Sequence, residues 1–122
     1  MTCELVAELA TGHGGDVALA ERMIHACAEA GADTVKVQSY SLDALNPADP
    51  QAEWLRTAWL SPEAHATLIQ VAKDAGVQFL ATPFDVASLV MLQGLGLRRF
   101  KIASSTAGVA AEWWRGELTE EE

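Results

Sequence analysis

The sequence predicts an α/β fold in which four parallel strands alternate with three helices. Three times, a helical pattern ends in a glycine that is followed at once by a strand, in EAGADTVKVQ, DAGVQFLATP and GLGLRRFKIAS. Glycine readily adopts the left-handed conformation that closes a helix, and the β-branched and aromatic residues that follow favour a strand. The chain also opens with a strand, CELVAEL. Such alternation is typical of a parallel sheet with right-handed crossovers.

Three helices connect these strands. The first runs from about Asp16, a residue type that caps helix amino termini, to Ala30. The second begins at Ser61 and Pro62, which suit the cap and the first helical position, and continues with apolar residues at helical spacing. The third follows Asp85.

A long connection, residues 41–60, separates the second strand from the second helix. Pro47 and Pro50 interrupt its first half, whereas Trp54, Leu55 and Trp59 predict a short helix that packs on another part of the molecule. Connections of this length are usually functional or mobile.

The second strand carries polar side chains on one face and apolar side chains on the other. Side chains alternate along a strand, so Val35 and Val37 point one way and Lys36 and Gln38 the other. Both faces of a parallel sheet are covered, either by helices or by the inside of a barrel. Charged groups fit poorly beneath helices but well at the carboxyl-end rim of a barrel. A complete (β/α)8 TIM barrel needs about 250 residues and eight strands, of which four are expected here, so Lys36 and Gln38 are interpreted as part of a binding rim.

Polar residues recur at the expected carboxyl ends of all four strands. They are Glu8, Lys36, Gln38, Thr82, Lys101 and Ser104. Two lysines that converge with hydroxyl donors form a pocket for a carboxylate or a phosphate. A nearby carboxylate can neutralise a developing cation or move a proton. The alternative is an ion pair between Lys36 and Glu8 that merely fills the top of the barrel.

The glycine-rich turn TGHGGD, residues 11–16, is a further candidate, because such turns expose backbone amides to a ligand. Its His13 is a metal ligand, a proton donor or a loop residue held by backbone hydrogen bonds. His25 and His65 lie within predicted helices and are expected at the surface.

The loop ATPFD follows the third strand. Pro83 biases Thr82 to an extended backbone and so fixes where the Thr82 hydroxyl points. Phe84 belongs either to the core or to the wall of a ligand site.

The composition excludes several classes of function. Half of the residues are hydrophobic, which is enough for a core. A net charge of −9 and a pI near 4.6 disfavour nucleic acids and anionic membranes as partners. Cys3 and Cys27 suggest neither a disulfide framework nor a zinc site and are expected as reduced thiols in the core. There is no basic amino-terminal region and no apolar run near the ~20 residues of a membrane span, so we expect a cytoplasmic protein.

Five segments resemble, in order and spacing, the amino-terminal half of the sialic acid synthases. They are VAELATGHGGD, GADTVKVQSY, LSPEAHATL, GVQFLATPFD and FKIASS. The family includes N-acetylneuraminate, legionaminate and pseudaminate synthases and the similar spore-coat polysaccharide proteins. The joint occurrence of K-x-Q, T-P-F-D and F-K-I-A-S makes the resemblance specific.

The resemblance implies that these residues form the amino-terminal half of a (β/α)8 TIM barrel. It also implies that the complete barrel condenses phosphoenolpyruvate with an N-acetylmannosamine-type sugar, with manganese or magnesium as the divalent metal. By this resemblance, the metal would polarise the open-chain aldehyde, the enol carbon would attack it, and water would add at the neighbouring carbon before phosphate leaves. By resemblance, the residues that hold phosphoenolpyruvate are Lys36, Thr82, Lys101 and Ser104. Gln38 would lie near both substrates, Glu8 at the reacting end and Phe84 on the sugar side, and His13 is also assigned to substrate binding.

The sequence departs from the family pattern at several points. Gly12 stands where asparagine usually precedes the loop histidine, and Ser105 and Thr106 stand where the family commonly has a small residue and an acid that contacts the sugar. We divide the chain into a partial barrel, residues 1–106, and a divergent acidic tail, residues 107–122. The later strands of the family carry the metal-binding histidines, so we expect the metal ligands outside this chain, and a homodimer for the full-length family.

Two alternatives stay open. The first is a non-catalytic half-barrel or interaction module, which would associate through its unpaired outer strands. The second is an open flavodoxin-like module, which polar residues at all four strand ends disfavour because ligands of that fold gather mainly at one switch point.

Overall fold

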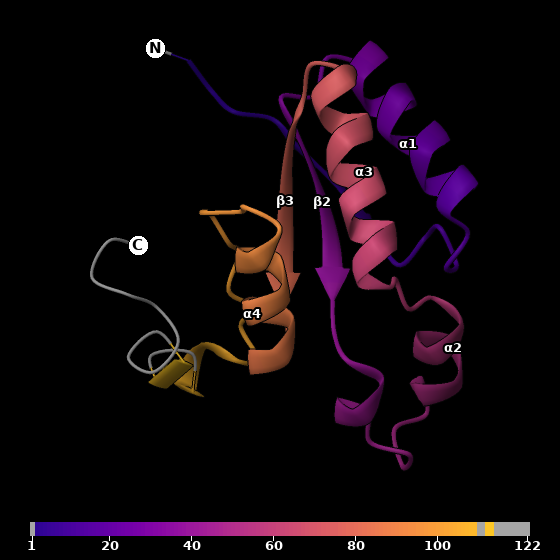
Figure 1. Ribbon diagram of the computed structural model, residues 1–122, viewed down its shortest axis with the longest axis vertical. Coiled ribbons are helices and arrows are strands. Elements are labelled where there is room, and N and C mark those ends of the chain that lie inside the picture. Colours follow the sequence, from indigo (N-terminus) through magenta and orange to yellow (C-terminus); the bar gives the residue numbers. More distant parts are fainter. Residues whose placement is uncertain (1, 110–111, 114–122) are drawn as a thin grey trace.

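The computed structural model describes residues 2–109 and 112–113 and contains a parallel sheet with helices packed against it (Figure 1). In chain order the elements are β1 Val6–Ala10, α1 Val17–Glu29, β2 Thr34–Ser39, the 3-10 helix η1 Leu42–Ala44, α2 Ala52–Thr57, α3 Pro62–Asp74, β3 Gln78–Pro83 and α4 Val86–Gly94. The strands lie in the order β1, β2, β3, and both neighbouring pairs are parallel. This arrangement confirms the predicted α/β class, and α2 confirms the short helix expected within the long connection.

The predicted fourth strand contributes a single bridge instead of a ladder. Phe100 forms an isolated parallel bridge with Ala81 of β3, and the Lys101 N–H donates to the Ala81 carbonyl at 3.0 Å. The segment therefore lies where a fourth parallel strand would lie, but the described residues form a sheet of three strands. The predicted acidic tail, residues 107–122, falls largely outside the described residues.

Local hydrogen bonds explain where the helices begin and end. Three side chains each accept a hydrogen bond from the N–H three residues later and so cap α1, α3 and α4: Asp16, Ser61 and Asp85. After α1 and α3, Gly31 (φ 98°) and Gly76 (φ 79°) take the left-handed conformation that the sequence predicts.

One face of the sheet is buried beneath α1, α3 and α4. Val35 and Val37 of β2 are fully buried, and they share one core cluster with Ile24, Leu68 and Leu92 of the three helices. Burying each of these large aliphatic side chains contributes about 1.5–3 kcal/mol. Because side chains alternate along β2, Lys36 and Gln38 point to the opposite face, which we call the inner face. The inner face is the one that the sequence predicts to line the inside of a barrel.

A polar network joins the amino-terminal ends of the strands. The two terminal guanidinium nitrogens of Arg99, Nη1 and Nη2, donate to the Glu4 carboxylate at 2.9 and 2.7 Å, and Nη2 also donates to the Gln78 side chain at 3.0 Å. The Thr34 hydroxyl donates to the same carboxylate. The bonds from Arg99 and then from Thr34 lower the pKa of Glu4 from 4.5 to about 2. The segment before β1 is thereby tied to the segment that follows α4.

The cysteines differ from the sequence expectation. Cys27 is partly buried and packs against the core, but Cys3, which precedes β1, is exposed. Both are free thiols. None of the helices in the described part of the chain is long and apolar enough to cross a membrane.

Candidate functional site

An ion pair lies on the inner face near the middle of β1 and β2. Glu8 and Lys36 are register partners, and Lys36 Nζ lies 3.0 Å from Glu8 Oε1. The Lys36 side chain is 15% exposed and that of Glu8 is 42% exposed. The other carboxylate oxygen of Glu8 accepts a hydrogen bond from Ala10 N–H at 3.1 Å, where the register of β1 shifts. A partly desolvated ammonium is thus held beside a carboxylate that is itself fixed by the backbone.

Gln38 and Thr82 form the next polar pair on the same face. They are register partners on β2 and β3, two residues beyond Lys36. Thr82 is buried and Gln38 is half-buried. The inner face therefore presents an ammonium, a carboxylate, an amide and a hydroxyl from three adjacent strands.

The remaining candidates of the strand ends lie on the segment beside β3. Lys101 follows the Phe100 bridge, and its Nζ donates to the neighbouring Ile102 carbonyl at 2.9 Å. Ser104 is exposed in the turn that follows. The structure places both residues at the carboxyl-terminal side of β3, with the Lys101 ammonium directed to its own segment.

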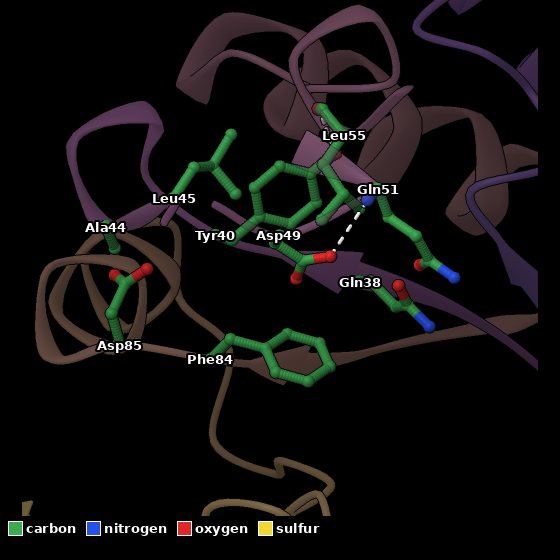
Figure 2. A pocket seen from close by; sticks show the side chains of 9 residues that line it. All are labelled: Gln38, Tyr40, Ala44, Leu45, Asp49, Gln51, Leu55, Phe84 and Asp85. Carbon is green, nitrogen blue, oxygen red and sulfur yellow. Dashed lines mark hydrogen bonds between the residues drawn. The ribbon is translucent and has the colours of Figure 1, made fainter. Parts of the chain in front are cut away.

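A cavity of about 360 Å³ opens beside Gln38, between the ends of β2 and β3 and the long connection (Figure 2). It is lined by Gln38, Tyr40, Ala44, Leu45, Asp49, Gln51, Leu55, Phe84 and Asp85. Figure 2 shows the rings of Tyr40 and Phe84 on opposite sides of the cavity. Phe84 is thus a wall residue, one of the two positions that the sequence left open. Tyr40, Asp49 and Gln51 were missed, because nothing in the spacing of a loop indicates which of its side chains turn inward.

Hydrogen bonds hold the connection over the cavity. The Asp85 carboxylate accepts from Ser41 N–H at 2.8 Å while it caps α4 through Ser88 N–H at 2.7 Å. The Tyr40 hydroxyl donates to the Leu55 carbonyl, and burial raises the pKa of Tyr40 to about 12. Hydrogen bonds therefore join the connection that forms the cavity wall to the end of β2 and to the start of α4.

His13 lies in the loop after β1, away from the lining of the cavity. It is buried, and its Nδ1 accepts a hydrogen bond from Gly15 N–H at 3.0 Å. Burial lowers the pKa of His13, and its Nε2 has no hydrogen-bond partner among the described residues. The bond from Gly15 holds His13 in the loop, and its assignment to substrate binding stays a prediction.

The loop that contains His13 packs closely against α2. A Cβ atom built on Gly15, which has φ 82°, would lie 2.1 Å from the Thr57 carbonyl oxygen. The Trp54 indole N–H donates to the Thr11 hydroxyl at 3.1 Å. The loop after β1 and the connection after β2 thus form one joined surface at the carboxyl ends of the strands.

His65 is buried, so the expectation that it lies at the surface is wrong. Its Nε2 lies 2.7 Å from Ser39 Oγ, and its Nδ1 lies 2.9 Å from the Ser61 carbonyl oxygen. His65 shares its helical stripe with Leu68 and Ala72, which are also buried, and this spacing is the signal that the sequence offered. His25 is exposed, as expected.

Comparison with known proteins identifies relatives over most of the chain. The NeuB family profile matches residues 23–110. The N,N'-diacetyllegionaminic acid synthase of Legionella pneumophila is 35% identical over 119 residues, which cover 85% of this chain and 33% of that protein. A synthase of the same description from Campylobacter jejuni is 36% identical and covers 82% and 34%.

A solved structure shows the same arrangement of elements. The N-acetylneuraminic acid (sialic acid) synthetase of Leptospira borgpetersenii superimposes with a TM-score of 0.81 and 33% identity, over 88% of this chain and 38% of that one. The sheet and its helices therefore correspond to the amino-terminal half of the barrel. The chain spans about a third of the length of the curated relatives that it matches.

Proposed function

Because the chain belongs to the NeuB family, we propose that it supplies the amino-terminal half of the catalytic barrel of a nonulosonic acid synthase. The reaction would join phosphoenolpyruvate to an N-acetylmannosamine-type sugar. Support comes from the relatives, which include synthases of legionaminic, pseudaminic and N-acetylneuraminic acids.

The observation that carries this proposal is the ion pair of Glu8 and Lys36 beside Gln38 on the inner face. An ammonium with little exposure attracts a carboxylate or phosphate strongly, because water screens it less. Lys36 has three N–H donors and gives one of them to Glu8, so two remain for a ligand.

Each candidate residue would have its own role in such a reaction. Lys36 and Lys101 would neutralise the carboxylate and phosphate of phosphoenolpyruvate, and the hydroxyls of Thr82 and Ser104 would donate hydrogen bonds to them. When the enol carbon forms its bond to the sugar aldehyde, positive charge develops at the neighbouring carbon. Glu8 would stabilise that charge and accept a proton from the water that adds there, before phosphate departs.

The cavity supplies room for the sugar. Its walls combine the aromatic rings of Tyr40 and Phe84 with the polar side chains of Gln38, Asp49 and Gln51. Mixed apolar and polar walls of this kind suit a ligand that carries both ring carbons and hydroxyl groups.

The family also implies manganese or magnesium, which would polarise the aldehyde. Within residues 2–109 and 112–113, no three histidine, cysteine, aspartate or glutamate side chains lie close enough together to hold a metal ion. The described residues do not fit a metal by themselves, so we assign no step to it here.

The test is phosphoenolpyruvate binding by a synthase that contains these residues, measured by calorimetric titration. Lys36→Ala and Lys101→Ala should each weaken binding by about tenfold or more, since a hydrogen bond to a charged group contributes about 1.5–3 kcal/mol. Lys73→Ala, an exposed lysine in the last turn of α3, is the control and should bind normally. Unchanged affinity in both test variants would refute the assignment of the site.

A second candidate function is a half-barrel that assembles with another copy without turnover. It is favoured by the outer strand β1, whose first residue, Val6, is 39% exposed and is preceded by Leu5, which is 57% exposed. Unpaired apolar edges promote association, and a lysine at an edge blocks it. Light scattering should then show an oligomer that Val6→Lys converts to a monomer, whereas a monomeric wild type excludes this candidate.

A further inference from the structure

A buried hydrogen-bonded pair lies directly behind the candidate site. Ser39 is the last residue of β2, and its hydroxyl lies 2.7 Å from Nε2 of His65 in the first turns of α3. Both residues are 1% exposed. The pair lies on the helix-covered side of the sheet, because Ser39 alternates with Gln38, which points to the inner face.

The partners of His65 determine its tautomer. The Ser61 carbonyl oxygen can only accept, so His65 Nδ1 must carry the hydrogen that it donates over 2.9 Å. Nε2 is then an acceptor, and the Ser39 hydroxyl donates to it. The imidazole therefore connects β2 to the residue that caps α3, with both of its nitrogens satisfied.

Ser39 is bonded to three residues of the cavity lining, two of them through the chain and one through a hydrogen bond. Its carbonyl accepts a hydrogen bond from Phe84 N–H at 2.9 Å, and its neighbours in the chain are Gln38 and Tyr40. All three of these residues line the cavity. A rotation of the backbone at Ser39 would move Gln38, Tyr40 and Phe84 together.

We propose that His65 is a positioning residue, whose hydrogen bond to Ser39 sets the orientation of Gln38 and of the cavity wall. The proposal rests on the proposed function, because it concerns the sugar side of that same site. His65 touches no substrate and acts through Ser39. Small displacements of residues that hold a substrate are costly to a reaction even when the fold is intact.

Variants of both partners in a synthase that contains these residues test the proposal. Ser39→Thr keeps the hydroxyl and His65→Gln keeps an acceptor near the position of Nε2, whereas Ser39→Ala and His65→Leu abolish the bond. We expect the KM for the sugar to rise about tenfold in Ser39→Ala and His65→Leu, because a misplaced substrate contact costs factors of this size. The KM for phosphoenolpyruvate should change less, and Ser39→Thr and His65→Gln should recover most of the sugar affinity.

A merely structural role predicts a different pattern. Partial unfolding lowers the concentration of active enzyme, so it reduces the apparent kcat and leaves both KM values unchanged. That pattern, or equal KM values for Ser39→Ala and Ser39→Thr, would overturn the proposal. Nitrogen NMR of labelled histidine should show the hydrogen on Nδ1 of His65 in the wild type, and a hydrogen on Nε2 instead would also contradict it.

A failure of the proposed function is distinguishable from a failure of this inference. If the wild type turns over no phosphoenolpyruvate with any N-acetylated sugar, the proposed function fails. The inference about His65 is then tested by the NMR signals of the Gln38 side-chain amide. These signals should shift in Ser39→Ala and keep their wild-type positions in Ser39→Thr. Signals that stay in place in both variants would show that the bond to His65 does not orient Gln38.

Discussion

The Lys36 ammonium lies 3.0 Å from the Glu8 carboxylate, on the neighbouring strand and in register with it. An anion that binds Lys36 must therefore share the ammonium with a carboxylate that is already present. Glu8 thus opposes anion binding through its charge while it holds Lys36 in place.

Glu8→Gln separates these two effects. The amide can still accept a hydrogen bond from Lys36 but carries no charge and cannot accept a proton. We expect kcat of a synthase that contains these residues to fall by about 10²–10⁴-fold, the range typical of a lost acid–base group. Phosphoenolpyruvate should bind at least as tightly as in the wild type, as measured by titration. Glu63→Gln, on the exposed first turn of α3, is the control. Loss of phosphoenolpyruvate binding together with turnover would mean that Glu8 serves only to position Lys36.

The ion pair of Glu4 and Arg99 should make the stability of the fold depend on pH in the acid range. The pKa of Glu4 is lowered from 4.5 to about 2, chiefly by Arg99, so folding is favoured by its ionised form. This contribution is complete above pH 4.5 and is lost as the pH falls toward 2. Thermal unfolding across this range should show a shallower decline for Arg99→Ala than for the wild type. Arg22→Ala, another exposed arginine, should decline as the wild type does, and parallel curves for Arg99→Ala would contradict the expectation.

Two buried histidines should add a second pH dependence at milder acidity. Burial lowers the pKa of both His13 and His65 below the ordinary 6.5. Each histidine therefore takes up a proton on unfolding, so stability is complete above about pH 6.5 and falls below it, by at most about 1.4 kcal/mol per pH unit for each residue. Denaturant titrations of His65→Gln should show a smaller decline, whereas exposed His25→Gln should show the wild-type decline. A wild-type stability that stays constant between pH 6.5 and 5 would disprove this.

The close approach of Gly15 to α2 predicts a large cost for a side chain there. Gly15→Ala forces a left-handed alanine and also brings its Cβ to 2.1 Å from the Thr57 carbonyl oxygen. The backbone strain alone costs about 1–3 kcal/mol, and relief of the clash adds to it. Gly31→Ala is a matched control, because its φ is 98° but nothing lies within 4 Å of the added Cβ. Equal losses of unfolding free energy in the two variants would contradict this expectation, because they would show that the loop moves away from Thr57 with no further loss of stability.

The core beneath α3 should respond strongly to truncation. Leu68 is fully buried in the core cluster, so Leu68→Ala should lower the free energy of unfolding by about 2–5 kcal/mol. Val90→Ala, on α4 and 45% exposed, should cost less than about 1 kcal/mol. Urea denaturation measures the free energy of unfolding of both variants. A loss for Leu68→Ala no larger than that for Val90→Ala would contradict the burial of Leu68 in the core.

Much of the fold could be predicted because its signals are local. The caps at Asp16 and Ser61, the glycines after the helices and the two-residue alternation around Lys36 all depend on a few adjacent residues. The extent of the fourth strand could not be predicted, because the local sequence does not determine how many backbone hydrogen bonds a segment makes to its neighbour, and Phe100 forms an isolated bridge with β3. The burial of His65 was missed because its polar type was given more weight than its position in the apolar stripe of α3.

The candidate site was predictable only in part. The inward direction of Lys36 and Gln38 follows from strand geometry. The cavity does not follow from it, because its wall depends on contacts between distant segments, such as the hydrogen bond from Tyr40 to Leu55 and that from Ser41 to Asp85. Such contacts have no signature in the order of the residues.

The order of strands in the sheet also bears on how the chain folds as it is synthesised. Each strand pairs with the strand made just before it, so β2 can dock on β1, and β3 on β2, while the ribosome is still adding residues. The bond between Glu4 and Arg99 joins residues 95 positions apart and can form only after all three strands have emerged. A nascent chain stalled before Arg99 would therefore hold its amino-terminal segment through earlier bonds, such as that from Thr34 to Glu4, but would lack the two bonds from Arg99, so this segment should be more open to proteases than in the finished chain.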